Sequence, residues 1–159
     1  MYRYHSEIRL DASLEDVWDF FTQPENLERL TPPSMGMEML TRTEEKMQIG
    51  QTISYRVKPL LGIPMVWKAE IEAMESLSFF IDRQLEGPYA YWRHIHRFEE
   101  SEDGVLCSDD IDYRLPFGPL GRLGNGFIKK QMDDLFQYRS LALEHEFGQS
   151  PRMLELSLA

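Results

Sequence analysis

One long helical stripe near the C-terminus constrains the fold of this chain more than any other feature. From about Leu120 to Phe147, apolar residues recur at helical spacing on one side. They are Leu120, Leu123, Phe127, Ile128, Met132, Leu135, Phe136 and Leu143. The charged residues that fall largely outside this stripe are Lys129, Asp133, Asp134 and Arg139. A helix of that length spans about 40 Å at 1.5 Å per residue, which is enough to cross a whole β-sheet.

The residues before this helix predict a series of antiparallel strands. Residues Tyr2–Leu10 alternate weakly and predict the first strand. Six further strands are predicted at Met35–Thr41, Gln51–Lys58, Met65–Met74, Phe79–Leu85, Tyr89–Glu99 and Val105–Leu115. Glycine and proline turn signals separate most of them. In the Met65–Met74 strand, apolar residues alternate with charged ones, which is typical of a sheet with one buried and one exposed face.

Two short helices are predicted between the first and second strands. Ser13 is suited to cap the first of them, and Asp16 stands at its third position, as in a capping box. Pro24 ends this helix and opens a second one over Glu25–Leu30. We therefore predict an α+β fold in which a curved antiparallel sheet of about seven strands wraps around the long C-terminal helix.

The size and composition of the chain fit one domain with a real core. The 159 residues predict a single domain over residues 1–148, followed by a C-terminal tail at 149–159. Hydrophobic residues make up 42% and aromatic residues 12% of the sequence. This is more aromatic surface than a minimal core needs, so we expect some of the rings to line a cavity.

Charge and cysteine content exclude several classes of function. A formal net charge of −10 repels phosphate backbones, so no nucleic-acid partner is predicted. No apolar stretch reaches the roughly 18 residues of a membrane span, so membrane insertion is not expected. Cys107 is the single cysteine, which excludes an intrachain disulfide. The N-terminus has no apolar signal core, and a cytoplasmic location is the default prediction. A partner protein or a homodimer is left open.

Three stretches of the sequence resemble the SRPBCC superfamily, the helix-grip group that contains START lipid-transfer domains and pollen-allergen-like proteins. They are Leu30–Pro33, then Phe80–Tyr89 leading into Trp92–Phe98, and then Asp109–Tyr113 followed by Leu115–Leu123. They look most like the bacterial ligand-binding, polyketide cyclase/dehydrase-like subgroup, some members of which are fused to a sugar-nucleotide-epimerase-like domain. The resemblance implies a helix-grip fold with a hydrophobic cavity between sheet and long helix. It implies no shared catalytic set.

The candidate site residues come from two adjacent strands and the long helix. In Tyr89–Glu99, the side chains of Trp92, His94, His96 and Phe98 share one face, which we expect to point inward. If the next strand faces the same way, Asp109 lies beside one of the histidines. The predicted cavity walls are Trp67, Trp92, Phe98, Tyr113, Phe127 and Phe136. The predicted polar anchors are His94, His96 and Asp109.

Three interpretations of His94 and His96 stay open. The first, which the sequence favours, has them satisfied in the pocket lining by Asp109, Tyr113 or water. In the second they orient a polar group of a ligand. In the third they bind a metal ion, but their spacing lacks an evident third ligand, so no metal and no cofactor are predicted. The direction of Asp82 and Gln84 is also left open.

Three functions are compatible with these patterns. We favour binding of a small hydrophobic or amphipathic molecule, such as a lipid, an isoprenoid or a polyketide-like compound. The alternative is a cyclase- or dehydratase-type enzyme that uses His94 or His96, supported by Asp109, as general acid or base. A third is an interaction domain with a filled core. Cys107 is interpreted as a core residue rather than a nucleophile.

Overall fold

The computed structural model describes residues 1–41, 46–60, 62–118, 121–147 and 153–157. Within these ranges, eight strands form one antiparallel sheet in the order β2-β3-β4-β5-β6-β7-β1-β8. The strands are β1 (Tyr2–Leu10), β2 (Glu38–Met39), β3 (Thr52–Leu60), β4 (Ile63–Glu75), β5 (Phe79–Glu86), β6 (Tyr91–Ser101), β7 (Gly104–Arg114) and β8 (Met153–Ser157). The seven predicted strands are all present. The additional one, β8, falls in the predicted tail and pairs with β1 at the edge of the sheet.

The two short helices predicted after the first strand are present, and the described residues contain five helical segments. They are α1 (Leu14–Phe21), α2 (Asn26–Arg29), the short 3-10 helices η1 (Pro33–Met35) and η2 (Gly121–Gly124), and α3 (Asn125–Phe147). Ser13 caps α1, because its Oγ accepts the backbone N–H of Asp16 at 3.1 Å. The strand predicted at Met35–Thr41 is reduced to β2. Proline fixes the backbone of η1, and Gly36 then adopts a left-handed φ of 53°, which interrupts an extended chain.

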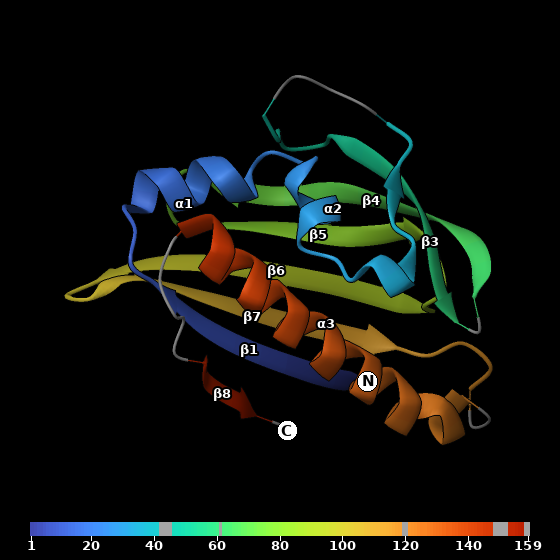
Figure 1. Cartoon of the computed structure of the whole chain (residues 1–159). Helices are drawn as coiled ribbons and strands as arrows, with labels where there is room; N and C mark the ends of the chain where they lie inside the picture. Colours follow the sequence, from blue (N-terminus) through green and yellow to red (C-terminus); the bar gives the residue numbers. More distant parts are fainter. Residues whose placement is uncertain (42–45, 61, 119–120, 148–152, 158–159) are drawn as a thin grey trace.

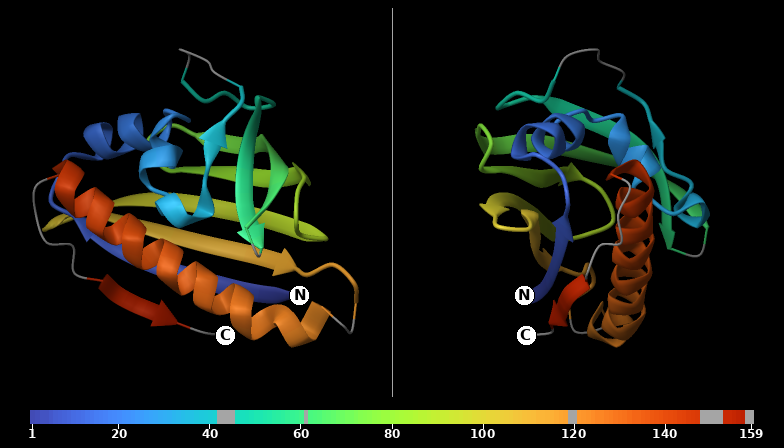
Figure 2. Two further views of the ribbon diagram at one scale, coloured as in Figure 1. Left: turned by 45° about the vertical axis from the view of Figure 1, so that its right-hand side comes forward. Right: turned by 60° about the vertical axis from the view of Figure 1, so that its left-hand side comes forward.

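The sheet curves around α3, which crosses its concave side diagonally (Figures 1 and 2). The helices α1 and α2 cover the same side near the other end of the sheet (Figure 1). This arrangement confirms the predicted α+β helix-grip fold. The helices α1, α2 and α3 all face the concave side of the sheet, and this geometry encloses an interior volume between helices and sheet.

The buried face of α3 differs from the predicted stripe. It consists of Ile128, Met132, Phe136, Arg139, Ser140 and Leu143. Leu123 and Phe127 are 86% and 53% exposed, and Leu120 lies outside the described residues. Arg139 was predicted outside the stripe, and this was wrong: it follows Ile128 by 11 residues, about three helical turns, and therefore lies on the same face. The helix also begins at Asn125, because the glycines before it form the separate turn η2.

Buried side chains form three clusters around the interior. Trp18 packs edge-on against Phe80 and Phe98 beneath α1. At the other end, Tyr4 stacks on Phe136 of α3 at a centroid distance of 5.1 Å. A third cluster lies over β3 and β4. Large rings near both ends of the sheet hold α1 and α3 in place by burying extensive apolar area.

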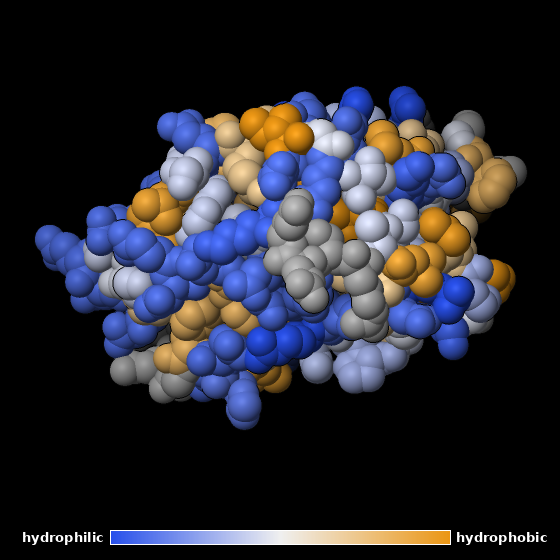
Figure 3. Space-filling view, turned by 90° about the horizontal axis from the view of Figure 1, so that it is seen from above, coloured by the Kyte–Doolittle hydropathy of each residue, from blue (hydrophilic) through white to orange (hydrophobic). Residues whose placement is uncertain are grey.

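The outer surface seen from above carries scattered apolar residues. Hydrophobic groups are separated by hydrophilic side chains on this face, without one continuous apolar patch among the coloured residues (Figure 3). Across the described part of the chain, every helix falls short of the combined length and apolar character that a membrane span needs. The apolar surface best suited to bind a small molecule is therefore sought in the interior.

Candidate functional site

A cavity of about 130 Å³ lies between the concave face of the sheet and the helices that cover it. Side chains from α1, α2, β3, β4, β5, β6 and α3 line it, and most of them are apolar. Representative apolar lining residues are Leu27, Leu30, Ile53, Trp67, Ile71 and Met132. A filled core, which the interaction-domain alternative required, does not fit this interior.

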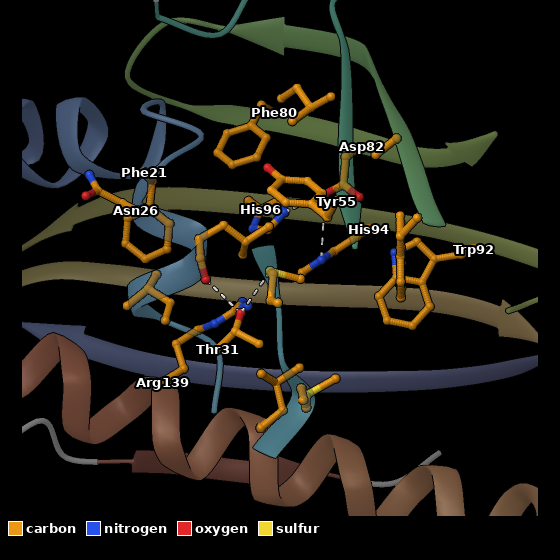
Figure 4. Close-up of a pocket in the computed structure, with 18 of the residues that line it drawn as sticks. Phe21, Asn26, Thr31, Tyr55, Phe80, Asp82, Trp92, His94, His96 and Arg139 are labelled. Carbon is orange, nitrogen blue, oxygen red and sulfur yellow. Dashed lines mark hydrogen bonds and ion pairs between the residues drawn. The ribbon is translucent and has the colours of Figure 1, made fainter. Parts of the chain in front are cut away.

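One wall of the cavity is polar and contains both histidines (Figure 4). His94 Nε2 donates to Asp109 Oδ1 at 2.7 Å, and His96 Nε2 donates to Asp82 Oδ2 at 2.8 Å. The two imidazole rings are 3.7 Å apart between centroids. All four side chains are largely buried, so these are interactions in a medium of low dielectric constant.

Each imidazole lies between the two carboxylates. On its second side, His94 Nδ1 is 3.8 Å from Asp82 Oδ2. His96 Nδ1 is 3.1 Å from Asp109 Oδ1, although the geometry is not that of a hydrogen bond. The predicted contact between Asp109 and a histidine is therefore present. Asp82 is a second carboxylate that the sequence analysis left unplaced.

The pairing of three strands brings these groups together. Asp82 of β5 stands opposite His94 of β6, and His96 stands opposite Asp109 of β7. Phe80 shares the inward face of β5 and stacks on the His96 ring at 4.2 Å between centroids. Gln84 has the same parity, and its Nε2 donates to the backbone carbonyl of Tyr89 at 2.8 Å. Asp82 thus faces the cavity, whereas alternation alone favoured solvent.

Arg139 reaches the polar wall from α3 (Figure 4). Its Nη1 is 3.8 Å from Asp109 Oδ1, and its guanidinium lies 4.8 Å from the centre of the Phe136 ring. The side chain is buried, and its Nε has no hydrogen-bond partner among the described residues. Sequence reasoning missed this residue, but a charge three turns after Ile128 on a buried stripe is a signal that could have found it. A buried guanidinium with spare N–H capacity is a site for an oxygen acceptor.

The electrostatics of the cluster distinguish the two histidines. Burial lowers the pKa of His94, and the neighbouring charge of His96 lowers it further. Burial also lowers the pKa of His96, but its contacts with Asp109 and Asp82 outweigh burial and raise the pKa overall. Burial would raise the pKa of Asp109, yet the hydrogen bond from His94 and the nearby imidazole of His96 hold it well below the usual range. His96 therefore holds a proton more firmly than His94, and neutral His94, which donates its Nε2–H to Asp109, carries its lone pair on Nδ1.

Six of the nine predicted site residues lie at this interior. Trp67, Trp92, His94 and His96 line the cavity itself. Asp109 and Phe136 line a smaller hollow of about 10 Å³, which shares Arg139 with the main cavity.

The other three predicted site residues do not line either hollow. Phe98 packs against Trp18 and Phe21, because α1 covers that end of β6. The Tyr113 hydroxyl donates to Asn125 Oδ1 at 2.9 Å, which ties β7 to the start of α3. Phe127 is turned outward because its position on α3 falls beside the buried face.

Cys107 is expected to be unreactive in the folded protein. It is buried between Ile8 and Phe98, which stand opposite it on the two neighbouring strands, and burial raises the pKa of its thiol. Each unit of increase lowers the reactive thiolate fraction about tenfold. A disulfide reagent such as Ellman's reagent should therefore modify Cys107 at pH 8 only after urea unfolds the chain. Fast stoichiometric labelling without urea would contradict this placement.

The sequence comparison gives the family of this protein. Residues 10–138 match the family described as "Polyketide cyclase / dehydrase and lipid transport". The chain belongs to this family. The resemblance to the SRPBCC superfamily is thereby confirmed. Among curated proteins, none matches the sequence.

Solved structures with low sequence identity share the fold of this family member. A protein from Thermus thermophilus is 20% identical, with 91% of this chain and 96% of that chain covered and a TM-score of 0.64. A START superfamily protein from Mycobacterium smegmatis is 13% identical, with 93% and 98% covered and a TM-score of 0.68. A nucleoside-diphosphate sugar epimerase from Corynebacterium glutamicum is 24% identical, with 84% of this chain but 28% of that chain covered and a TM-score of 0.53.

Proposed function

We propose that this protein binds a small amphipathic molecule whose apolar body fills the cavity and whose oxygen-bearing group contacts the polar wall. The observation that carries the proposal is an apolar cavity that ends at a buried cluster of His94, His96 and Arg139. Pockets for small molecules typically combine apolar walls with a few polar anchors of this kind. A lipid, an isoprenoid or a polyketide-like compound has the required character, and the family description supports this class.

The polar wall offers both a donor and an acceptor to such a ligand. Arg139 has an unpaired Nε–H, which suits a carbonyl or carboxylate oxygen. His94 Nδ1 carries a lone pair 3.8 Å from Asp82, which suits a hydroxyl donor. A ligand that carries a hydroxyl and a carbonyl group close together would use both. A purely hydrocarbon ligand would leave these groups without partners at a cost in affinity.

Native mass spectrometry of the freshly purified protein tests the proposal. The expected result is a co-purifying small molecule that is released on unfolding and then identified by its mass. His94→Ala and His96→Ala should reduce its occupancy if these side chains anchor it. Unchanged occupancy in both variants would remove the anchor role, and an empty protein that also fails to take up amphipathic probes would remove the proposal.

Filling the cavity should abolish binding without disturbing the outer surface. Ala69 is a buried lining residue of β4, and a phenylalanine there would project its ring into the 130 Å³ cavity. We expect Ala69→Phe to weaken binding of the fluorescent probe 1-anilinonaphthalene-8-sulfonate by at least about tenfold, or about 1.4 kcal/mol. The matched control is Val66→Phe, at an exposed position of opposite parity on the same strand. Equal binding by the two variants would argue against the cavity as the binding site.

A cyclase- or dehydratase-type enzyme is the second candidate, and one observation favours it. Asp109 fixes the Nε2–H tautomer of His94 at 2.7 Å, which leaves Nδ1 of a cavity-lining imidazole available as a general base. If the bound molecule is converted on incubation, His94→Gln should lower the rate by roughly 10²–10⁴-fold while the ligand is still bound. Retained turnover in this variant would exclude His94 as the base.

We also infer that the protein acts in the cytoplasm on a freely diffusing small molecule. The single cysteine, Cys107, is a buried free thiol, which suits a reducing compartment. Fractionation of the cells that produce the protein tests it directly.

A further inference from the structure

We propose that Asp82, His94 and His96 form a binding site for one divalent transition-metal ion of the zinc type at the polar wall of the cavity. This site goes beyond the proposed ligand binding, which requires no metal. No metal is predicted from the sequence, because the two histidines have no evident third ligand there. Asp82 is that third ligand, because the pairing of β5 with β6 places it opposite His94.

The three side chains converge at a distance suited to a small ion. One ligand atom from each lies within 4.8 Å of the others. Asp82 Oδ2 is 2.8 Å from His96 Nε2 and 3.8 Å from His94 Nδ1. A tetrahedral ion with bonds of about 2.0–2.1 Å separates neighbouring ligand atoms by about 3.3 Å. The two separations from Asp82 Oδ2 therefore differ from this value by about 0.5 Å each, one shorter and one longer.

The surroundings of the two imidazoles match those of metal-ligating histidines. Such histidines almost always present their second ring nitrogen to a carboxylate, a carbonyl or a water molecule. Here Asp109 Oδ1 lies beside that second nitrogen in both rings, at 2.7 Å from His94 Nε2 and 3.1 Å from His96 Nδ1. A neutral imidazole has one donor and one acceptor nitrogen, so a histidine that only fills a core does not need a carboxylate beside each of its nitrogens. Both imidazoles lie between Asp109 on one side and Asp82 on the other. Their nitrogens on the Asp82 side are therefore oriented to bind one metal ion together with Asp82.

The charge of the cluster favours a cation at this point. With both imidazoles neutral, as metal ligation requires, Asp82 and Asp109 contribute two negative charges and Arg139 one positive charge. Arg139 approaches Asp109, at 3.8 Å, rather than the proposed ligand Asp82. Two imidazole nitrogens with one carboxylate oxygen favour zinc-type ions over Mg²⁺ or Ca²⁺, which prefer oxygen ligands throughout.

The position of the site links the ion to the cavity. Three protein ligands leave a fourth coordination position of zinc open, as in catalytic zinc sites. All three proposed ligands line the cavity. The open position therefore faces the space in which we place the small molecule, where an oxygen of that molecule or water would complete the coordination.

Metal titration of the chelator-treated full-length protein tests this site. We expect Zn²⁺ to bind at one ion per chain by calorimetry, and Co²⁺ to give the visible absorption of a four- or five-coordinate ion. Asp82→Asn, His94→Gln and His96→Gln should each abolish this stoichiometric binding. Asp109→Asn should weaken it by about 10–100-fold, because it removes only the outer partner.

The matched control is a second histidine–aspartate pair that lies outside the cavity. His5 Nδ1 is 2.8 Å from Asp110 Oδ1, and neither residue is among those that line the cavity. His5→Gln and Asp110→Asn should leave the titration unchanged. Binding that persists in the Asp82, His94 and His96 variants, or that is lost in the controls, would assign the ion to the acidic surface and overturn the proposal. Absence of stoichiometric binding would overturn it as well.

A measurement on the unaltered protein guards against variants that fail to fold. Zn²⁺ should shift the imidazole ¹⁵N resonances of His94 and His96 in NMR spectra, but not those of His5 or His145. Shifts confined to His5 or His145 would reject the site. Binding of the small molecule is measured separately in the presence of a chelator. Ligand binding and metal binding are therefore tested independently, and either proposal can fail alone.

Discussion

Replacement of Asp109 by alanine is expected to lower the free energy of unfolding of the metal-free protein by about 3–5 kcal/mol. Asp109 is the buried counter-charge for His96 and Arg139, and it also accepts the hydrogen bond from His94. Its removal leaves the buried guanidinium of Arg139 and the two imidazoles with Asp82 as the carboxylate that remains beside the histidines. Urea unfolding at pH 7, monitored by circular dichroism, measures the loss.

Asp110→Ala is the control for this experiment. Asp110 follows Asp109 in β7 and pairs with Arg97 and His5, with its side chain 30% exposed. Because partly exposed ion pairs contribute little, we expect a loss below about 1 kcal/mol. Equal losses in the two variants would show that Asp109 stabilises the fold no more than an ordinary surface carboxylate.

The stability of the metal-free protein should fall steeply in acid. Burial would raise the pKa values of Asp109 and Asp82, but hydrogen bonds from the histidines hold both below the ordinary value of about 3.9. A carboxyl group with a lowered pKa in the folded state stabilises the fold above its unfolded pKa. That contribution is lost as the pH falls through the folded pKa. We therefore expect the free energy of unfolding to decrease from about pH 4 downward.

The histidines act in a separate pH range and in opposite directions. The lowered pKa of His94 disfavours folding below about pH 6.5, where the unfolded chain takes up the proton more readily. The raised pKa of His96 stabilises the fold below the same pH, and this contribution is lost as the pH rises through the folded pKa. The two effects offset each other in part. The decrease in the free energy of unfolding below about pH 4 therefore reflects mainly the two carboxyl groups.

Urea titrations at pH 7, 5, 4 and 3 would measure this dependence. The expected signature is a smaller slope in Asp109→Asn than in the unaltered protein below pH 4, because the variant lacks the titrating carboxyl group. Asp110→Asn serves as the surface control and should retain the slope. Parallel curves for the unaltered protein and Asp109→Asn would contradict the assignment.

Several features of the fold followed from local patterns alone. Ser13 and Asp16 defined the start of α1, because a cap depends on residues adjacent in sequence. Alternation through Trp67, Ala69 and Ile71 identified the inward face of β4, because side chains on a strand alternate strictly. The same rule placed His94 and His96 on the cavity side of β6 and predicted that Asp109 would meet one of them.

Local patterns were insufficient where both faces of an element are buried or where a polar residue shares an apolar face. In β5, Phe80 and Ile81 are both buried, so alternation with Ile81, which favoured solvent for Asp82, was an unreliable guide to its direction. On α3, Arg139 was grouped with the charged residues because its residue type weighed more than its position. Its burial depends on Asp109 and Phe136, which come from other parts of the fold.

Local residue patterns were sufficient to predict the order of the elements, the exposed and buried faces of the regular strands, and the two inward histidines, because these properties follow from periodicity along the chain. The complete polar cluster depends on the three-dimensional fold, because Asp82, His94, Asp109 and Arg139 come from four separate elements. Strand register and the path of α3 set the distances between them. Whether two imidazoles share a proton, a ligand or a metal ion depends on such distances, which no local pattern contains.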